Sequence, residues 1–155
     1  FKKFKKGAGK FMERIIQEKI SADHLLYVSL KYTKTADVIL NLLSRWRNMI
    51  DLSIDKLLEQ SKKDKKIKSI PIAPKLKVDL LKDVYKKEKD ILNALELYDF
   101  WKKVPELEKL KENEFRKNVT LKVQSKGEWI DINMDKLKEY SVVMETFIKK
   151  IRTIL

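Results

Sequence analysis

The sequence contains no cysteine, a single histidine and only three glycines among its 155 residues. Without cysteine the chain forms no disulfide, no cysteine-ligated zinc or iron–sulfur site and no thiol nucleophile. One histidine leaves almost no room for histidine metal chemistry or for a histidine-based catalytic relay. Three glycines are too few for a fold built on phosphate-cradling loops. These absences favour a non-catalytic protein that holds no metal and no cofactor.

Arginine and acidic residues are also scarce relative to lysine. The chain has 36 basic and 23 acidic side chains, a formal net charge of +13, and only five of the basic residues are arginine. Lysine is a strongly hydrated point charge, whereas arginine is the usual reader of bases and phosphates. The excess therefore favours non-specific attraction to polyanions. The alternative interpretation is solubility, or the lysine and glutamate enrichment of proteins that work at high temperature.

Long apolar runs are missing as well. No stretch approaches the roughly 18 residues that would cross a bilayer, and none has the pattern of a signal peptide. We therefore expect no membrane span and a cytoplasmic location. The length allows one domain. We predict a basic flexible tail over residues 1–10 and a single helical-bundle domain over residues 11–155.

The strongest pattern is a stripe of mostly apolar residues with steps of three and four between Leu25 and Leu57. This periodicity predicts one long helix from about Ser21 to Ser61, with Ser21 as its N-cap. The alternative is a break near residues 33–35. A helix of this length is expected to pack against other helices or against a copy of itself.

The rest of the chain predicts further helices and one hairpin. Apolar and polar residues alternate over about 119–132, and Gly127 is suited to the left-handed position of the turn. The fold class is therefore all-α, an antiparallel helical bundle with long helices and a small β-hairpin insertion before the C-terminal helix. The other expected elements are a short helix after the tail, a linker over 62–75, a helix from about Pro74 to Lys103, a short turn or helix from Pro105 to about Glu112, and a helix from Met134 to about Thr153 with Asn133 as its cap.

Most of the excess charge lies in two segments. Residues 1–20 and 61–75 together hold ten of the thirteen excess positive charges. If the chain binds RNA or DNA, these lysines would contact phosphates, with two arginines of the long helix in support. Otherwise they are solvated charge runs. The candidate nucleic-acid-binding residues are Lys2, Lys3, Lys5, Lys6, Lys10, Arg45, Arg47, Lys62, Lys63, Lys65 and Lys66.

Two tryptophans are candidates for an oligomer interface. Trp46 belongs to the apolar stripe, which places it in the core or in an interface. Trp129 alternates with Ile130 and Ile132, so it faces outward if the isoleucines face the core. The leading hypothesis is a non-catalytic helical interaction module, either a homo-oligomer or a subunit that binds a protein partner. The alternative is a nucleic-acid-binding protein.

Weaker patterns suggest chemistry without requiring it. Asp51, Asp55 and Glu59 recur every fourth residue, and such a row could hold a hard cation if another carboxylate faced it. These acids flank the apolar stripe, which favours ordinary surface positions. His24, beside Asp23, could act as an acid or base. It is equally suited to the surface near a helix start.

Two segments resemble a known group. The segment SADHLLYVSLKYTKTADVILNLLSRWRNMIDLSIDKLL resembles a helix of small archaeal helical-bundle proteins that are compared with HEPN domains. The segment NVTLKVQSKGEWIDINMDKLKEYSVVMETFIKKI resembles the hairpin and helix that end such proteins. The resemblance implies a bundle that often dimerises and binds nucleotides, RNA or a partner protein. Ribonucleases of that kind carry an arginine, then four to six other residues, then a histidine. Here Arg14 lies ten residues before His24, so the resemblance implies no cleavage.

Overall fold

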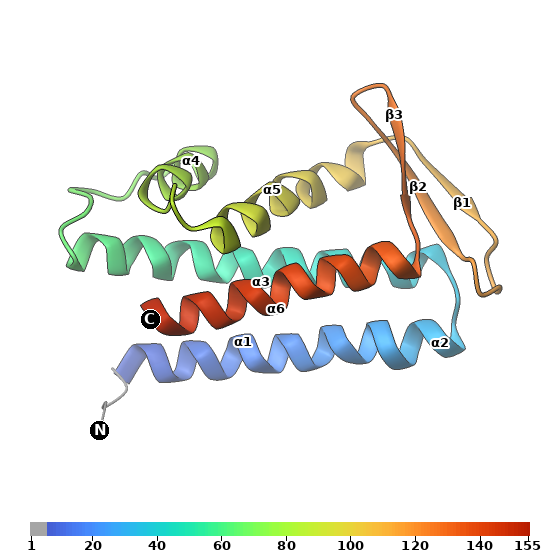
Figure 1. Ribbon diagram of the computed structural model, residues 1–155, viewed down its shortest axis with the longest axis horizontal. Helices are drawn as coiled ribbons and strands as arrows, with labels where there is room; N and C mark the ends of the chain where they lie inside the picture. The colour runs from blue at the N-terminus through green and yellow to red at the C-terminus, as the bar shows by residue number, and fades with distance from the viewer. Residues whose placement is uncertain (1–5) are drawn as a thin grey trace.

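The computed structural model describes residues 6–155, with side chains from residue 9 onward. The protein is mostly helical, and a small antiparallel sheet precedes the last helix (Figure 1). Within the described range, no helix is both long and apolar enough to span a membrane. The elements are α1 (Lys6–His24), the π-helix η1 (Leu25–Ser29), α2 (Leu30–Tyr32), α3 (Ala36–Lys63), α4 (Pro74–Val84), α5 (Lys89–Lys103), the 3-10 helix η2 (Val104–Glu106), β1 (Lys109–Glu112), β2 (Thr120–Ser125), β3 (Glu128–Ile132) and α6 (Met134–Ile154).

The predicted long helix is wrong, because the chain reverses at residues 33–35. One helical rod runs from α1 through the π-helical turn η1 to α2, and α3 then returns along it (Figure 1). Thr35 is the N-cap of α3, and its hydroxyl accepts the Val38 N–H at 3.4 Å. Ser21 lies inside α1 and caps nothing. The reversal is favoured because it buries the apolar faces of the rod α1–η1–α2 and of α3 against each other. One straight helix would leave these faces exposed.

Two further boundaries differ from the prediction. The helix expected from Pro74 to Lys103 is broken after Val84, where buried Tyr85 ends α4 and its N–H donates to the Leu81 carbonyl at 2.9 Å. The break lets α4 and α5 both pack on α3 in different directions (Figure 1). Residues 6–10, which the prediction assigns to the tail, form the start of α1, and residues 1–5 lie outside the described residues.

The β-hairpin is confirmed and a third strand joins it. Lys126 and Gly127, with φ of 52° and 79°, form the two-residue turn between β2 and β3. Positive φ at both positions is typical of the turn that fits the strand twist. β1 pairs with β2, giving the order β1-β2-β3. The prediction of a turn or helix up to Glu112 missed β1, since this short edge strand has little apolar alternation of its own.

The core of the bundle holds a cluster of three aromatic rings. The Trp46 and Trp101 rings stack with their centroids 5.5 Å apart, and the Tyr140 ring meets both edge-on. These rings come from α3, α5 and α6, so the cluster joins three helices. Trp46 is only 2% exposed. The prediction that Trp46 forms an oligomer contact is therefore corrected: its indole is covered within one chain.

Candidate functional site

Three segments that are distant in the sequence meet at one end of the bundle. α3 and α6 both run toward the end where α1 begins, and the loop after α3 lies there too (Figure 1). The Lys66 ammonium lies 5.5 Å from the ring centroid of Tyr85, at the turn between α4 and α5. Lys150 of α6 pairs with Glu88 of the same turn at 2.9 Å. We call the surface formed by residues 62–68, 86–90 and 149–152 the basic end.

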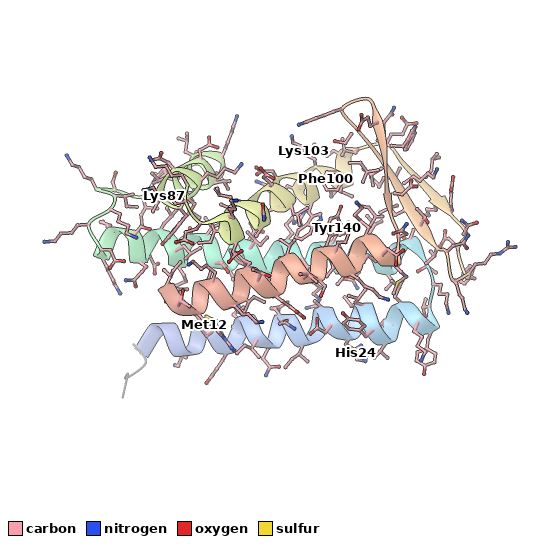
Figure 2. The ribbon with its side chains drawn as sticks, viewed as in Figure 1. Met12, His24, Lys87, Phe100, Lys103 and Tyr140 are labelled. Atoms are coloured by element: carbon pink, nitrogen blue, oxygen red, sulfur yellow. The ribbon has the colours of Figure 1, made fainter. Side chains whose placement is uncertain are left out.

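The basic end has a large excess of positive charge, and few of its basic side chains form ion pairs. It contains eleven basic and three acidic residues. Within the described part of the chain, Lys150 is the only one of the eleven with an ion-pair partner within 4.0 Å. Figure 2 places Lys87 here and Lys103 at the other end, beside the sheet. Because the other ten charges have no such partner, their potentials add over a small area.

The end of α3 explains how its lysines are presented. The Lys66 N–H donates to the Ser61 carbonyl at 2.9 Å, and the Lys65 N–H donates to the Lys62 carbonyl at 3.1 Å. These two hydrogen bonds form a Schellman motif, in which glycine is the usual residue at the left-handed position. Here Lys65 occupies it with φ of 59°. The chain therefore turns sharply and keeps charged side chains on both sides of the turn.

Helix dipoles account for part of this charge. Cations near the C-terminal ends of α3 and α6 are favourable because unpaired carbonyls give these ends partial negative charge. That explanation covers residues 62–63 and 149–152. Lys66 has the face of the Tyr85 ring as a partner. The remaining lysines of the basic end, Lys65, Lys68, Lys86, Lys87 and Lys89, have no ion pair within the described residues.

The structure brings together only some of the predicted nucleic-acid-binding residues. Lys62, Lys63, Lys65 and Lys66 are all exposed at the basic end. Exposed Lys10 lies near the start of α1, toward the same end (Figure 1). Lys2, Lys3 and Lys5 lie outside the described residues, and only the backbone of Lys6 is described.

Part of the basic end was not predicted from the sequence. Three exposed lysines of the turn between α4 and α5 belong to it, as do the basic residues near the end of α6. No local pattern in the sequence could have joined these segments to the linker, because only helix packing brings them together. The residues missed are Lys86, Lys87, Lys89, Lys149, Lys150 and Arg152.

Arg45 and Arg47 do not join the basic end. Both lie in the middle of α3, and sixteen residues from Arg47 to Lys63 correspond to about 24 Å along a helix. Arg45 pairs with Glu18 of α1 at 3.3 Å, which links two helices. Arg47 lies close enough to Tyr98 to act on its pKa, which burial and a hydrogen bond to Asp51 raise well above its usual range. Their positions suit packing contacts better than phosphate binding.

The acidic row on α3 is occupied by neighbouring donors. Asp51 accepts the Tyr98 hydroxyl, Asp55 pairs with Lys77 at 2.8 Å, and Glu59 lies 3.5 Å from Lys56. Within the described range, no three acidic or histidine side chains gather in a way that could hold a metal ion. The row therefore lacks the opposing carboxylate that the cation hypothesis needs.

His24 is exposed at the end of α1, where the π-helical turn begins. Its Nδ1 lies 3.3 Å from the Ser29 hydroxyl. Neighbouring Asp23 instead accepts a hydrogen bond from Lys19 at 2.6 Å. Asp23 therefore orients the lysine rather than the histidine, and the arrangement lacks the relay that general base catalysis uses.

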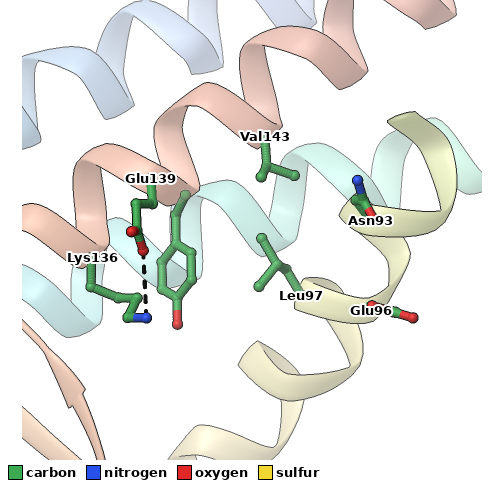
Figure 3. Close-up of a pocket in the computed structure, with 7 residues that line it drawn as sticks. Asn93, Glu96, Leu97, Lys136, Glu139 and Val143 are labelled. Carbon is green, nitrogen blue, oxygen red and sulfur yellow. Dashed lines mark ion pairs between the residues drawn. The ribbon is translucent and has the colours of Figure 1, made fainter. Parts of the chain in front are cut away.

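A shallow pocket of about 260 Å³ lies between α5 and α6 (Figure 3). Leu97 and Val143 face each other across it, and Lys136 pairs with Glu139 at 3.4 Å at one side. Burial, assisted by Glu139, raises the pKa of Tyr140 to about 12. The phenol is therefore neutral near pH 7 and unsuited to act as a base. The other lining residues are Asn93 and Glu96.

Trp129 faces outward, as the alternation predicts. It is 42% exposed, while Ile132 is buried and Ile130 is partly covered. The register pairs Gln124 with Trp129, which places the indole on the outer face of the sheet. Exposed Leu110 of β1 lies on the same face.

In comparisons with protein-family models, curated proteins and solved structures, nothing matches this chain. The resemblance to HEPN-like bundles therefore stays a prediction.

Proposed function

We propose that this protein binds nucleic acid through non-specific phosphate contacts at the basic end. The observation that carries the proposal is the meeting of three distant segments in one surface with eleven basic and three acidic residues. Basic segments that serve only solubility do not have to lie together on one surface. Lysines without ion-pair partners can neutralise phosphates and so release the cations condensed on a nucleic acid.

The chemistry of the surface favours affinity without sequence readout. Each lysine that neutralises a phosphate releases a bound counterion, and this release drives binding at low salt. Lysine offers no rigid fork for the edge of a base, so the surface contacts the backbone of any sequence alike. Because the basic end lies at one end of the bundle, a ligand bound there would not cover the long faces of the helices.

The test removes four charges from the basic end. We expect Lys62, Lys63, Lys65 and Lys66, all changed to Gln, to lower affinity for any single-stranded oligonucleotide. The slope of log affinity against log salt should fall by about 3, since each contact contributes about 0.7. Fluorescence anisotropy of a labelled oligonucleotide over a salt series measures both quantities.

The matched control removes four lysines that already have acidic partners. Lys77, Lys82, Lys111 and Lys122 pair with acids on other elements, so changing them to Gln gives the same net charge. The proposal requires a much smaller loss of affinity in this control. Equal losses in the two variants would mean that the overall net charge, rather than the basic end, attracts the ligand.

The second candidate function is self-association through the outer face of the sheet. The apolar stripe that first suggested self-association is used inside the chain, but Trp129 and Leu110 remain exposed on one face. β1 and β3 are also the edge strands of this sheet. Light scattering on the same samples gives the molar mass, and a dimer that Trp129→Ser converts to monomer would support this candidate. A monomer at all concentrations would exclude it.

A further inference from the structure

At the end of the bundle opposite the basic end, two aromatic rings stand in solvent. Tyr32, at the end of α2, and Phe115, in the loop between β1 and β2, are each 78% exposed. Large aromatic side chains are usually covered at least in part, because each has much apolar surface to remove from water. We call residues 31–34 and 114–117 the aromatic knuckle.

The two segments of the knuckle are joined by backbone contacts. The Phe115 N–H donates to the Lys34 carbonyl at 2.6 Å. The Ala36 N–H, in the first turn of α3, donates to the Glu114 carboxylate at 3.4 Å. These bonds dock the loop against the turn between α2 and α3. Both rings are therefore presented from backbone whose position is set.

The backbone of the loop is strained in order to present Phe115. Asn113 and Phe115 have φ of 55° and 67°, in the left-handed region. Asparagine tolerates this region, but phenylalanine is uncommon there, and glycine would adopt it without steric cost. Because the ring is not buried, packing does not offset the strain. A side chain that strains the backbone and buries little points to a role outside folding.

The surroundings of the rings are cationic. The Lys31 ammonium lies 5.9 Å from the centroid of the Tyr32 ring. Within the described residues, Lys31, Lys34, Arg116 and Lys117 have no acidic partner within 4.0 Å, and all but partly covered Lys34 are exposed. The nearby acids are engaged: Glu114 accepts from the start of α3, and Asp37 pairs with Lys111 at 3.1 Å.

Exposed aromatic rings, surrounded by cations that have no acidic partner, are suited to a ligand that has flat rings and negative charge. We propose that Tyr32 and Phe115 form a base-stacking subsite for single-stranded nucleic acid, with Arg116 and Lys117 on its phosphates. Only a single strand offers base faces, since stacking covers them in a duplex. This inference deepens the proposed function, on which it rests for the ligand class, but it uses different residues. The 28 residues of α3 span about 42 Å between the two surfaces, so each surface can be changed without altering the other.

The test compares two oligonucleotides that differ only in their bases. A labelled thymidine hexanucleotide and an abasic hexanucleotide carry the same phosphates, so their affinity ratio reports stacking alone. We expect the wild-type protein to bind the thymidine strand about tenfold more tightly. Phe115→Gly should clearly lower the ratio, with the Tyr32 ring left in place, and should cause no loss of stability, since glycine relieves the left-handed strain. Phe115→Tyr should keep the ratio.

Controls separate the knuckle from other aromatic and basic surfaces. Trp129→Ser removes an exposed indole outside the knuckle and should leave the ratio unchanged. The four-lysine variant lacks the base-independent binding proposed for the basic end, so its ratio should be larger than that of the wild-type protein if that proposal holds and the same if it fails. Equal affinity of the wild-type protein for both strands, or no binding of either, would overturn the inference. A ratio that persists in Phe115→Gly would overturn it as well.

Discussion

The buried aromatic cluster and the aromatic knuckle use the same kinds of side chain in opposite ways. Trp46 and Trp101 are each about 2% exposed and stack across two helices. Tyr32 and Phe115 are each 78% exposed, and neither ring takes part in an aromatic pair within the described structure. The cluster thus stabilises the fold by removing apolar surface from water. The knuckle leaves apolar surface in water, as the proposed stacking role requires.

The same contrast applies to lysine. Lys122 of the sheet lies within 4.0 Å of Glu112 and Asp131, on the strands either side of it. Lys66 at the basic end instead lies over the face of Tyr85 and has no acidic partner within that distance in the described part of the chain. Paired and unpaired lysines have equal charge in a sequence count. Only the unpaired ones remain free to bind phosphates.

Of the changes considered, a substitution in the buried aromatic cluster should have the largest effect on the free energy of unfolding. We expect Trp46→Ala to lower the free energy of unfolding by about 3–5 kcal/mol, because it leaves a cavity between three helices. Phe115→Ala should change it by no more than about 0.5 kcal/mol, since the ring is exposed. Urea unfolding followed by far-ultraviolet circular dichroism measures both. Similar costs in the two variants would contradict the contrast between cluster and knuckle.

An alkaline titration sharpens the picture of the cluster. Burial raises the pKa of Tyr140 from 10.0 to about 12 in the folded protein. The Tyr140 hydroxyl therefore keeps its proton to a higher pH in the folded state than in the unfolded state. This contribution to stability is complete below about pH 10 and is lost as the pH rises toward about 12. It amounts to at most about 3 kcal/mol, because a difference of one in pKa corresponds to about 1.4 kcal/mol.

The control for this titration is Tyr140→Phe, which has no phenol to ionise. Its free energy of unfolding should decline less steeply than that of the wild-type protein across the same pH range. Tyr98 and Lys19 also have raised pKa values, so both proteins keep some decline from these groups. Identical curves for the two proteins would show that the Tyr140 phenol is not buried as described.

The smallest expected effect concerns backbone strain at exposed positions, which Lys65 shares with Phe115. Lys65→Gly should raise the free energy of unfolding by about 0.5 kcal/mol, because glycine adopts the left-handed conformation without steric cost. Lys63→Gly removes the same charge from the last turn of α3 and should lower it by about the same amount. Thermal unfolding of the pair measures the difference. A loss of stability in Lys65→Gly would contradict the strain argument.

Features that depend on neighbouring residues were predictable. Asn133 caps α6 through its side-chain oxygen, which accepts the Lys136 N–H at 2.9 Å, as its place before the apolar steps predicts. Gly127 and Trp129 likewise have the predicted conformation and exposure. β1 was missed because its pairing with β2 depends on a partner strand rather than on a pattern within Lys109–Glu112.

The helical class, the hairpin and the amount of positive charge can be predicted from the amino-acid sequence. These properties follow from periodicity, capping and composition, which act over a few residues. Tertiary structure alone decided the reversal at residues 33–35, the burial of Trp46, and the meeting of three basic segments at one end. It also docked Phe115 beside Lys34. Each of these depends on which distant segments pack together, because burial and electrostatic potential are properties of neighbours in space.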